Sequence, residues 1–317
     1  MQKTSEQNSF LKTVFIFGPT AVGKTDFSYQ LSAHSKRAII NCDIGQFYKQ
    51  LSIGTAKPDF LSNTIPHYLF DILDESEVCN IADYRESCDK LIAELATTAT
   101  LPIFVGGSLF YAESLFFKQP ARFELAGIDR LEKEKYSWAL LNRIDPLRAS
   151  RIHHNDTYRI DRALDIWYTT GTLPSDHTLS FDPLTKESTI FFLTREREDL
   201  YERINKRTEF MLQNGWIEEV EQLSSGWKKF IKEKKIIGYA EIVDFLHNGS
   251  RDSKKLTEII AQKTRNYAKR QLTYWNKLKS KLLGCNGITI HEINLTLSRI
   301  DLYLDLATSL NQNIKNE

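Results

Sequence analysis

The sequence is poor in the residues that hold small secreted or zinc-binding domains together. Its 317 residues include only four cysteines, Cys42, Cys79, Cys88 and Cys285, and none of them forms a CxxC pair. This spacing argues against a zinc site and against a disulfide framework. It is typical of proteins kept in a reducing compartment, so we expect a cytoplasmic protein.

Long hydrophobic runs are also missing. The longest apolar run, near residues 14–17, is far shorter than the roughly 20 residues that span a bilayer. The first dozen residues are polar, so we expect no signal peptide. With 41% hydrophobic and 26% charged residues, the composition is that of a globular chain. The length predicts one large domain with an insertion, or two domains.

Neither sign of charge dominates, because 42 Lys and Arg face 41 Asp and Glu. The distribution along the chain is uneven, however, and residues 195–281 carry 20 basic and 13 acidic side chains, a net charge of +7. Within residues 261–281, seven basic and no acidic residues are interleaved with Tyr267, Tyr274 and Trp275. Such a pattern is typical of a nucleic-acid-binding surface, and the alternative is a solvated helix whose aromatic residues face the core.

Short apolar runs alternate with amphipathic stretches in the first third of the chain. We expect strands at residues 14–17, 38–40, 67–73 and 101–105, and helices at 24–33, at 81–97 and from residue 108. Alternation of strands and helices predicts an α/β fold built on a parallel sheet.

The pattern changes near residue 120. Residues 120–186 read as helices and loops without a convincing strand, with helices at about 128–142 and from Asn155 or Asp156 to Gly171. Beyond them we expect a returning strand at 189–193, helices at 199–214, 216–223, 239–246 and 256–282, an edge strand at 288–290 and a final helix. We therefore predict a P-loop-type α/β core of residues 1–119 and 187–317, with a helical, basic C-terminal part, and a helical insertion domain at 120–186.

A glycine-rich phosphate-binding motif follows the first expected strand. The segment GPTAVGKT fits GxxxxGK[ST] and consists of Gly18, Pro19, Thr20, Ala21, Val22, Gly23, Lys24 and Thr25. Its backbone N–H groups and the start of the next helix favour a phosphate, and Lys24 adds a positive charge. The Thr25 hydroxyl is a ligand for Mg²⁺, which we expect as a cofactor. The motif alone leaves open whether the ligand is ATP, GTP or another pyrophosphate.

The aspartate that usually accompanies this loop is missing from its usual place. The strand at 101–105 ends in Gly106, Gly107 and Ser108 instead of an Asp that helps to hold Mg²⁺. The obvious carboxylate is Asp43, directly after the second strand, and the carboxyl ends of parallel strands meet at one edge of the sheet. Asp43 would hold Mg²⁺, accept a proton from a nucleophile, or cap a turn.

Further segments resemble the tRNA dimethylallyltransferase (tRNA isopentenyltransferase) family, collinearly over about residues 14–275. They are NCDIGQFYKQLSIGTAKP (41–58), PHYLFDILD (66–74), IADYRE (81–86), PIFVGGSLFY (102–111), RIHHNDTYRIDRAL (151–164), YERINKR (201–207), IGYAE (237–241) and TRNYAKRQLTYW (264–275). The P-loop is generic, whereas IGTAKP together with AKRQ is close to diagnostic.

The resemblance implies transfer of a dimethylallyl group from dimethylallyl diphosphate to N6 of the adenosine 3′ to the anticodon of tRNA. It implies that the P-loop holds the donor's diphosphate, that Asp43 is the general base, that Ser108 contacts substrate and that Arg207 stabilises the diphosphate. The tRNA contacts that it implies are Asp43, Ile44, Gly45, Gln46, Ser108, Arg130, Tyr158, Arg159, Ile160, Asp161, Arg162, Lys235, Gly238, Lys269, Arg270 and Gln271. At this size we expect a monomer.

The sequence departs from the family pattern at a few positions. Ile44 stands where the family usually has Ser, Ser108 replaces a Thr but keeps a hydroxyl, and Leu109 and Phe110 are bulkier than usual.

The residues alone also allow two other functions. A P-loop kinase that phosphorylates a small molecule or nucleoside with ATP would leave the basic end unexplained. A nucleotide-regulated RNA-binding protein would not need Asp43 and Arg207 beside the loop.

Overall fold

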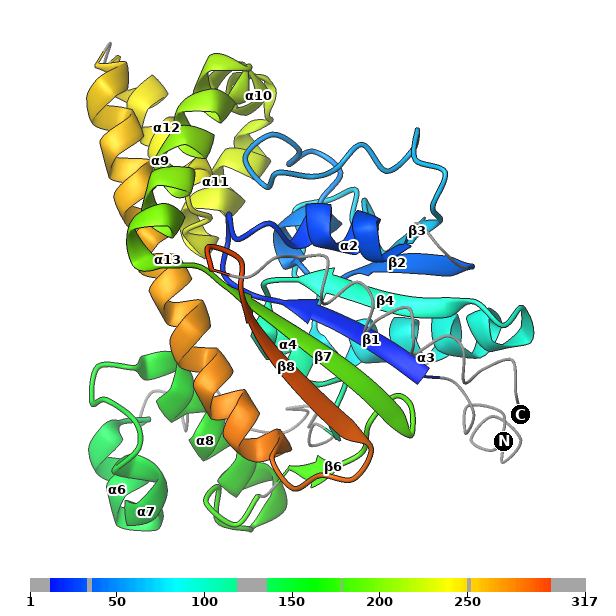
Figure 1. Cartoon of the computed structure of the whole chain (residues 1–317). Coiled ribbons are helices and arrows are strands. Elements are labelled where there is room, and N and C mark those ends of the chain that lie inside the picture. The colour runs from blue at the N-terminus through cyan, green and yellow to red at the C-terminus, as the bar shows by residue number, and fades with distance from the viewer. Residues whose placement is uncertain (1–11, 33–35, 119–135, 178, 250–251, 298–317) are drawn as a thin grey trace. The chain divides into compact units, whose positions relative to one another are not determined.

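The computed structural model describes residues 12–32, 36–118, 136–177, 179–249 and 252–297 (Figure 1). Contacts divide the chain into two compact units, one of Met1–Leu115 with Pro183–Glu317 and one of Phe116–Asp182. The second unit overlaps the insertion domain expected at residues 120–186. Among the described residues, no helix is both long and apolar enough to cross a membrane.

The first unit is built on a six-stranded sheet in which every pair of neighbours is parallel. Its strand order is β3-β2-β4-β1-β7-β8. In that order the strands are His67–Tyr68, Arg37–Asn41, Leu101–Gly106, Lys12–Phe17, Glu187–Thr194 and Ile288–Asn294. The expected α/β fold with a parallel sheet is confirmed, and β8 is the edge strand that the sequence predicts.

The third strand is shorter than the seven residues expected at 67–73. It pairs with β2 only at His67 and Tyr68. Directly beyond it, Leu69 and Asp71 adopt positive φ angles of 61° and 51°, and this left-handed backbone cannot continue a strand. Here the local turn overrides the apolar pattern.

The central strand β1 is buried on both faces, which explains its unbroken apolar sequence. Val14 and Ile16 pack on one face with Phe27 and Leu31 of helix α2 (Lys24–Ser32). Phe15 points to the opposite face and stacks on Phe104 of β4, with ring centroids 5.1 Å apart. The sheet therefore holds the P-loop, which follows β1, on a rigid base.

Helices surround this sheet and continue beyond it. The first half of the unit adds the 3₁₀ helix η2 (Ile44–Phe47), α3 (Ile81–Thr97) and α4 (Leu109–Glu113). The second half adds α9 (Arg197–Gln213), α10 (Trp216–Gln222), α11 (Ser225–Lys234), α12 (Tyr239–His247) and α13 (Ser253–Leu282). In Figure 1, α10, α11 and α12 gather near the first turns of the long helix α13.

Helix α11 was not among the expected helices, because its sequence reads as a cluster of lysines. Trp227, Phe230 and Ile231 recur at helical spacing within that cluster and are buried. They join residues of α10 and α12 in a second hydrophobic core. The lysines therefore occupy the solvent side of an amphipathic helix.

The second unit contains α6 (Trp138–Ile144), α7 (Pro146–Ala149) and α8 (Thr157–Thr170). Helix α8 begins and ends as predicted, with Asp156 capping it and Gly171 in a left-handed conformation at φ 67°. The expectation that this region has no strand was wrong. Strand β6 (Ser180–Phe181) pairs antiparallel with β5 (Phe117–Lys118). A two-residue strand carries too little alternation to be recognised in the sequence.

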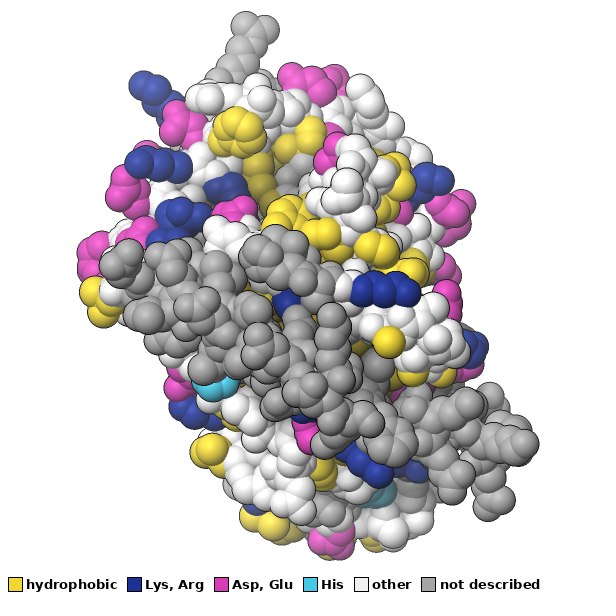
Figure 2. Space-filling model, turned by 45° about the vertical axis from the view of Figure 1, so that its right-hand side comes forward, with side chains coloured by type: hydrophobic (Ala, Val, Ile, Leu, Met, Phe, Trp, Pro, Cys, Tyr) yellow, Lys and Arg dark blue, Asp and Glu magenta, His cyan; other side chains and the backbone are white. Residues whose placement is uncertain are grey.

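Three expectations fall on residues outside the described ranges. They are residues 128–135 of the helix expected at 128–142, the residue Arg130 and the final helix of the tail. Within the described residues that expected helix starts late, because Ser137 is extended and caps α6 at Trp138. On the face shown in Figure 2, Lys and Arg side chains lie among Asp and Glu side chains over the described surface.

Candidate active site

The P-loop wraps around the end of β1 in the conformation that a phosphate site needs. Gly18 has a φ of 153°, and a Cβ there would lie 2.5 Å from the carbonyl oxygen of Leu193. Gly23 has a φ of 110°, in the region that favours glycine. The Lys24 ammonium folds over the loop and donates to the carbonyls of Gly18 and Pro19 at 3.0 and 2.9 Å. Its charge is thereby held at the centre of the loop.

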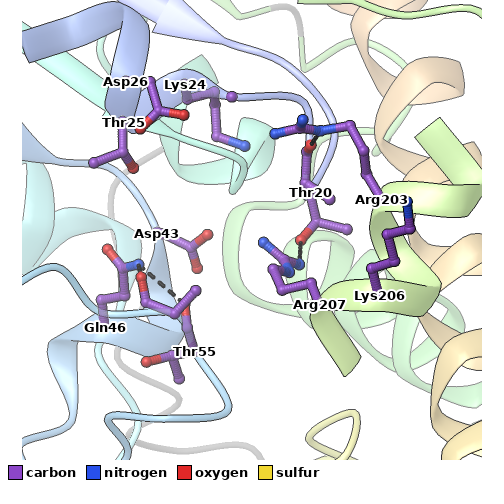
Figure 3. A pocket seen from close by; sticks show the side chains of 13 residues that line it. Thr20, Lys24, Thr25, Asp26, Asp43, Gln46, Thr55, Arg203, Lys206 and Arg207 are labelled. Carbon is purple, nitrogen blue, oxygen red and sulfur yellow. Dashed lines mark hydrogen bonds between the residues drawn. The ribbon is translucent and has the colours of Figure 1, made fainter. Parts of the chain in front are cut away.

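Asp43 lies at the carboxyl end of β2, as the sequence predicts, and faces Lys24 across a cavity (Figure 3). One carboxylate oxygen accepts from the Gly45 N–H at 3.2 Å, so Asp43 also caps η2. Burial raises the pKa of the Asp43 carboxyl, while the Lys24 charge, the Gly45 N–H and Arg207 each lower it. A carboxylate with a raised pKa is a better proton acceptor than an exposed aspartate.

Ser108 holds the backbone beside Asp43. Its N–H donates to the Cys42 carbonyl and its hydroxyl accepts from the Ile44 N–H, both at 3.1 Å. Tyr267 lies near Ser108 and Asp43, and burial together with the Asp43 charge raises the pKa of its hydroxyl. Tyr267 was expected only as one of the aromatic residues of a basic helix, so its place beside Asp43 is new.

Arg207 extends from α9 towards the P-loop, where it donates a hydrogen bond to the Thr20 hydroxyl. Burial lowers the pKa of Arg207 to about 10, so its guanidinium keeps its charge at neutral pH. One turn earlier, Arg203 donates to the Ala21 carbonyl at 2.9 Å, and Arg195 donates to the Val22 carbonyl at 2.8 Å. Arg203 was not among the expected site residues, although its four-residue spacing from Arg207 places both arginines on the same side of α9.

These residues line a cavity of about 420 Å³ (Figure 3). Its lining consists of Thr20, Ala21, Gly23, Lys24, Thr25, Asp26, Asp43, Gln46, Thr55, Ala56, Arg203, Lys206 and Arg207. Four of these side chains are basic and two are carboxylates, so the cavity suits a polyanionic ligand. Burial lowers the pKa of Lys24 to about 8, an effect that Arg207 increases and Asp43 opposes.

The donor set of this cavity fits a Mg²⁺ ion shared with a phosphorylated ligand. Thr25, Asp26 and Asp43 supply hydroxyl and carboxylate oxygens, the hard ligands that Mg²⁺ prefers. Among the described residues, no three His, Cys, Asp or Glu side chains gather into a metal site. Any Mg²⁺ here would therefore depend on oxygens from the ligand and from water as well.

Gln271, expected as a tRNA contact, is buried beneath the P-loop. Its amide oxygen accepts from the Thr20 N–H and its amide nitrogen donates to the Gly107 carbonyl, both at 2.9 Å. Only 4% of the residue is exposed. In this structure the side chain ties α13 to the P-loop and has no free surface for RNA.

The basic face of α13 separates into paired and unpaired cations. Lys279 pairs with Glu292, and Lys281 pairs with Glu113. Lys269, Arg270 and Lys277 are exposed and form no ion pair with carboxylates of the described residues. These three cations remain available for a polyanion.

The aromatic residues of α13 mostly face inwards. Trp275 is buried and stacks on Phe192 at 4.2 Å, and Tyr274 donates to the Glu113 carboxylate. The alternative interpretation, aromatic residues turned into the core, is therefore correct for Trp275.

Two groups of the remaining expected tRNA contacts belong to the first unit. Ile44, Gly45 and Gln46 belong to η2 and its capping turn, and Gln46 lines the cavity. Lys235 and Gly238 flank the turn between α11 and α12, where both have positive φ angles. These positions stay predictions as RNA contacts.

The residues expected from the second unit lie in the first turns of α8. Tyr158 is 76% exposed, and Arg159, Asp161 and Arg162 are exposed as well. Ile160 is buried in the core of that unit with Leu141 and Leu164, so its side chain supports the helix. RNA contact by the four exposed residues stays a prediction.

Comparison with known proteins adds independent information. A model of the family described as IPP transferase matches residues 46–278. The chain is 35% identical to the tRNA dimethylallyltransferase of Thermotoga neapolitana, over 92% of this chain and 98% of that protein. It is 27% identical to a tRNA delta(2)-isopentenylpyrophosphate transferase of Staphylococcus epidermidis whose crystal structure is known, with a TM-score of 0.63 over 96% of this chain and 99% of that chain.

The fold also matches a eukaryotic dimethylallyltransferase acting on tRNA, with a TM-score of 0.76 and 24% identity, over 96% of this chain and 80% of that chain. The family match covers most of the chain, and the bacterial relative is matched over nearly its whole length. The chain therefore belongs to the tRNA dimethylallyltransferase (IPP transferase) family.

Proposed function

We propose that this protein transfers a dimethylallyl group from dimethylallyl diphosphate to N6 of the adenosine 3′-adjacent to the anticodon in tRNA, releasing diphosphate. The observation that carries the proposal is the presence of Asp43 in the same cationic cavity as Lys24 and Arg207. A diphosphate leaving group needs the cations, and an amine nucleophile needs the carboxylate.

The reaction exchanges one bond at the allylic carbon for another. The bond between that carbon and the diphosphate oxygen breaks, and its electron pair leaves with the diphosphate. A new bond forms between the carbon and N6 of adenosine, and the N6 proton passes to the Asp43 carboxylate. The P-loop N–H groups, Lys24 and Arg207 stabilise the negative charge that develops on the leaving oxygens.

Mg²⁺ belongs to the proposal as a cofactor, held by Thr25 together with diphosphate oxygens and water. When bound, it would neutralise part of the diphosphate charge. Asp26 and Asp43 both line the cavity, so they are the carboxylates available to orient its water ligands.

The acceptor adenosine must leave the stacked anticodon loop to reach Asp43. Enzymes that modify a base extrude it into a pocket and read its edges there. The exposed cations Lys269, Arg270 and Lys277 are suited to contact phosphates on either side of the extruded nucleotide. The substrate is accordingly tRNA with an accessible loop rather than a free nucleoside.

A kinase that uses ATP is the alternative, because a P-loop also binds nucleotides. It is not favoured, since the relatives are named for dimethylallyl transfer to tRNA and a kinase does not explain the basic face of α13. We further propose a cytoplasmic monomer, in keeping with four unpaired cysteine thiols.

A donor-choice experiment tests the proposal. The protein is incubated with unmodified tRNA and either dimethylallyl diphosphate or ATP, and the released diphosphate and any phosphorylated product are measured. We expect diphosphate release that requires both tRNA and the prenyl donor. Transfer of phosphate from ATP to an acceptor, with no response to the prenyl donor, would establish the kinase instead.

A further inference from the structure

One wall of the reaction cavity is a loop without regular secondary structure, at residues 52–57. Thr55 and Ala56 of this loop line the cavity, and the Gln46 side chain donates to their carbonyls at 3.0 and 3.2 Å. The loop also crowds the turn that follows Asp43, because a Cβ on Gly45 would lie 3.1 Å from the Thr55 methyl group. The shape of the cavity beside Asp43 therefore depends on where this loop is held.

The loop is held by one carboxylate from the helical region. Glu219 of α10 accepts from the N–H groups of Ser52 and Ile53 at 3.1 and 2.8 Å through one oxygen. Its other oxygen accepts from the Tyr239 hydroxyl at 2.6 Å, and that hydroxyl accepts from the Gly54 N–H at 3.1 Å. Three consecutive N–H groups of the loop are thus bound, two by the Glu219 carboxylate and the third by the Tyr239 hydroxyl that donates to it. Hydrogen bonds to a charged acceptor are the strong ones.

A tryptophan fixes the distance between the loop and the helices. Trp216 lies three residues before Glu219, on the same side of α10, and is 3% exposed. A Cβ on Gly54 would approach its indole to 2.2 Å, and a Cβ on Gly238 would approach it to 2.0 Å. The ring therefore lies against both the cavity loop and the turn before α12.

Thr55 of the loop lies on the other side of Asp43 from Thr20 and Arg207, and Gln46 lies on the same side as Thr55 (Figure 3). A displacement of the loop would alter the space for the acceptor base and leave the P-loop in place.

We propose that Glu219 is a positioning residue for the acceptor side of the reaction. It holds residues 52–56 so that Thr55 and Gln46 shape the space in which the adenine meets Asp43. This inference rests on the proposed function. It predicts that loss of the Glu219 charge affects the use of tRNA and spares the use of the prenyl donor.

The test uses the full-length Glu219→Gln variant, which keeps the size of the side chain and removes its charge. Glu218→Gln is the matched control, because Glu218 is exposed on the same helix. The first readout is amide hydrogen exchange of residues 52–56, which does not require turnover. We expect exchange at least about tenfold faster in Glu219→Gln and unchanged in Glu218→Gln.

The second readout is steady-state kinetics with each substrate varied in turn. We expect kcat/KM for tRNA to fall at least about tenfold in Glu219→Gln, because a misplaced acceptor costs rate, while KM for dimethylallyl diphosphate stays within about twofold. Tyr239→Phe should likewise lower kcat/KM for tRNA and leave KM for dimethylallyl diphosphate nearly unchanged. The double variant should lose less than the product of the two single losses, since both act on one hydrogen-bonded group.

The outcomes separate this inference from the proposed function. If wild type and Glu218→Gln do not turn over, the proposed function fails, and hydrogen exchange still decides whether Glu219 holds the loop. Unchanged exchange overturns the inference. It is equally overturned if Glu219→Gln lowers only the melting temperature or the active fraction, with both KM values unchanged. If Glu219→Gln does not fold, Tyr239→Phe decides by the same readouts.

Discussion

At Asp43, two opposing effects set the chemistry of a single carboxylate. Burial raises its pKa, which strengthens it as a base, while Lys24 and Arg207 lower the pKa and keep the carboxylate charged. The same two cations are placed to receive the diphosphate. In the proposed function, a bound diphosphate would neutralise them and raise the pKa of Asp43 further. Donor binding would therefore prepare the proposed base.

Replacement of Asp43 by Asn isolates the role of the carboxylate. The amide retains an oxygen to accept from Gly45, so the fold of the turn is preserved, but it cannot accept a proton. We expect single-turnover rates to fall by about 10²-fold or more. The dissociation constant for tRNA, measured by filter binding, should change little. A comparable loss of binding would show that Asp43 acts mainly as a contact.

The lowered pKa of Lys24 predicts a pH dependence for donor use. In the free protein Lys24 is charged below pH about 8 and neutral above it. Because the diphosphate needs this charge, kcat/KM for dimethylallyl diphosphate should decline above that pH. Arg207, with a pKa of about 10, stays charged over the same range. A profile that stays flat from pH 8 to pH 9, about one unit beyond the pKa of Lys24, would contradict the assignment.

At the scale of elements, the site depends on contacts from the helical half of the chain. Gln271 of α13 links the P-loop to the turn after β4, Arg203 and Arg207 of α9 reach the P-loop, and Glu219 of α10 holds the cavity loop. Each contact joins segments more than 160 residues apart. The helices therefore shape the phosphate site as well as the expected RNA surface.

Gln271→Ala tests the link between α13 and the P-loop. It leaves the Thr20 N–H without a partner inside the protein, which costs about 1–3 kcal/mol, while the Gly107 carbonyl still accepts from the Leu109 N–H at 3.1 Å. We expect a lower melting temperature and a KM for the prenyl donor raised several-fold. Thr273→Ala, at an exposed position of the same helix, is the control. An unchanged donor KM would show that the P-loop holds its shape without Gln271.

Gly54→Ala tests the contact between the cavity loop and Trp216. The new methyl group would lie 2.2 Å from the indole, so the loop or the ring must move. We expect the free energy of unfolding to fall by about 1–3 kcal/mol, as in other overpacked cores. Gly226→Ala, where the nearest atom is 3.7 Å away, should cost little in chemical denaturation. Equal effects of the two changes would count against the tight contact.

Much of this arrangement follows from sequence patterns, because they reflect local physics. The apolar run of β1, the P-loop after it and the 17-residue helix α3 are visible in the chain itself. Asp43 and Ser108 are placed correctly because parallel strands end at one edge of the sheet.

Contacts between distant segments are not visible in the same way. Glu219 reads as one of several acidic residues on a short helix, and Gln271 reads as part of a basic surface. Only the packing of α10 and α13 against the loops shows that both side chains are turned inwards. Helix α11 and strand β6 were missed because lysines and short length hide their periodicity.

At the scale of the whole molecule, a near-neutral chain carries its positive charge unevenly. The total of 42 basic and 41 acidic residues includes a net +7 within residues 195–281. Several of those cations are already paired, so the number of residues free for RNA is smaller than the count suggests. The affinity for tRNA should therefore depend on a few exposed side chains.

Salt dependence distinguishes free from paired cations. Lys269→Ala removes an exposed cation, and we expect weaker tRNA binding and a slope of log K against log salt reduced by about one. Lys279→Ala removes a cation that is paired with Glu292, so its slope should change less. Binding is followed by filter retention over a range of KCl concentrations. If Lys279→Ala lowers the slope as much as Lys269→Ala does, pairing with a carboxylate does not decide which lysines bind tRNA.

Nucleoside analysis reports whether Asp43 and the P-loop together prenylate tRNA. Wild type and Asp43→Asn are incubated with dimethylallyl diphosphate, Mg²⁺ and unmodified tRNA, and the digested nucleosides are analysed by mass spectrometry. We expect N6-dimethylallyladenosine from wild type, in equal amount to released diphosphate, and almost none from Asp43→Asn. Absence of this nucleoside with folded wild type, or equal yields from both proteins, would contradict this expectation.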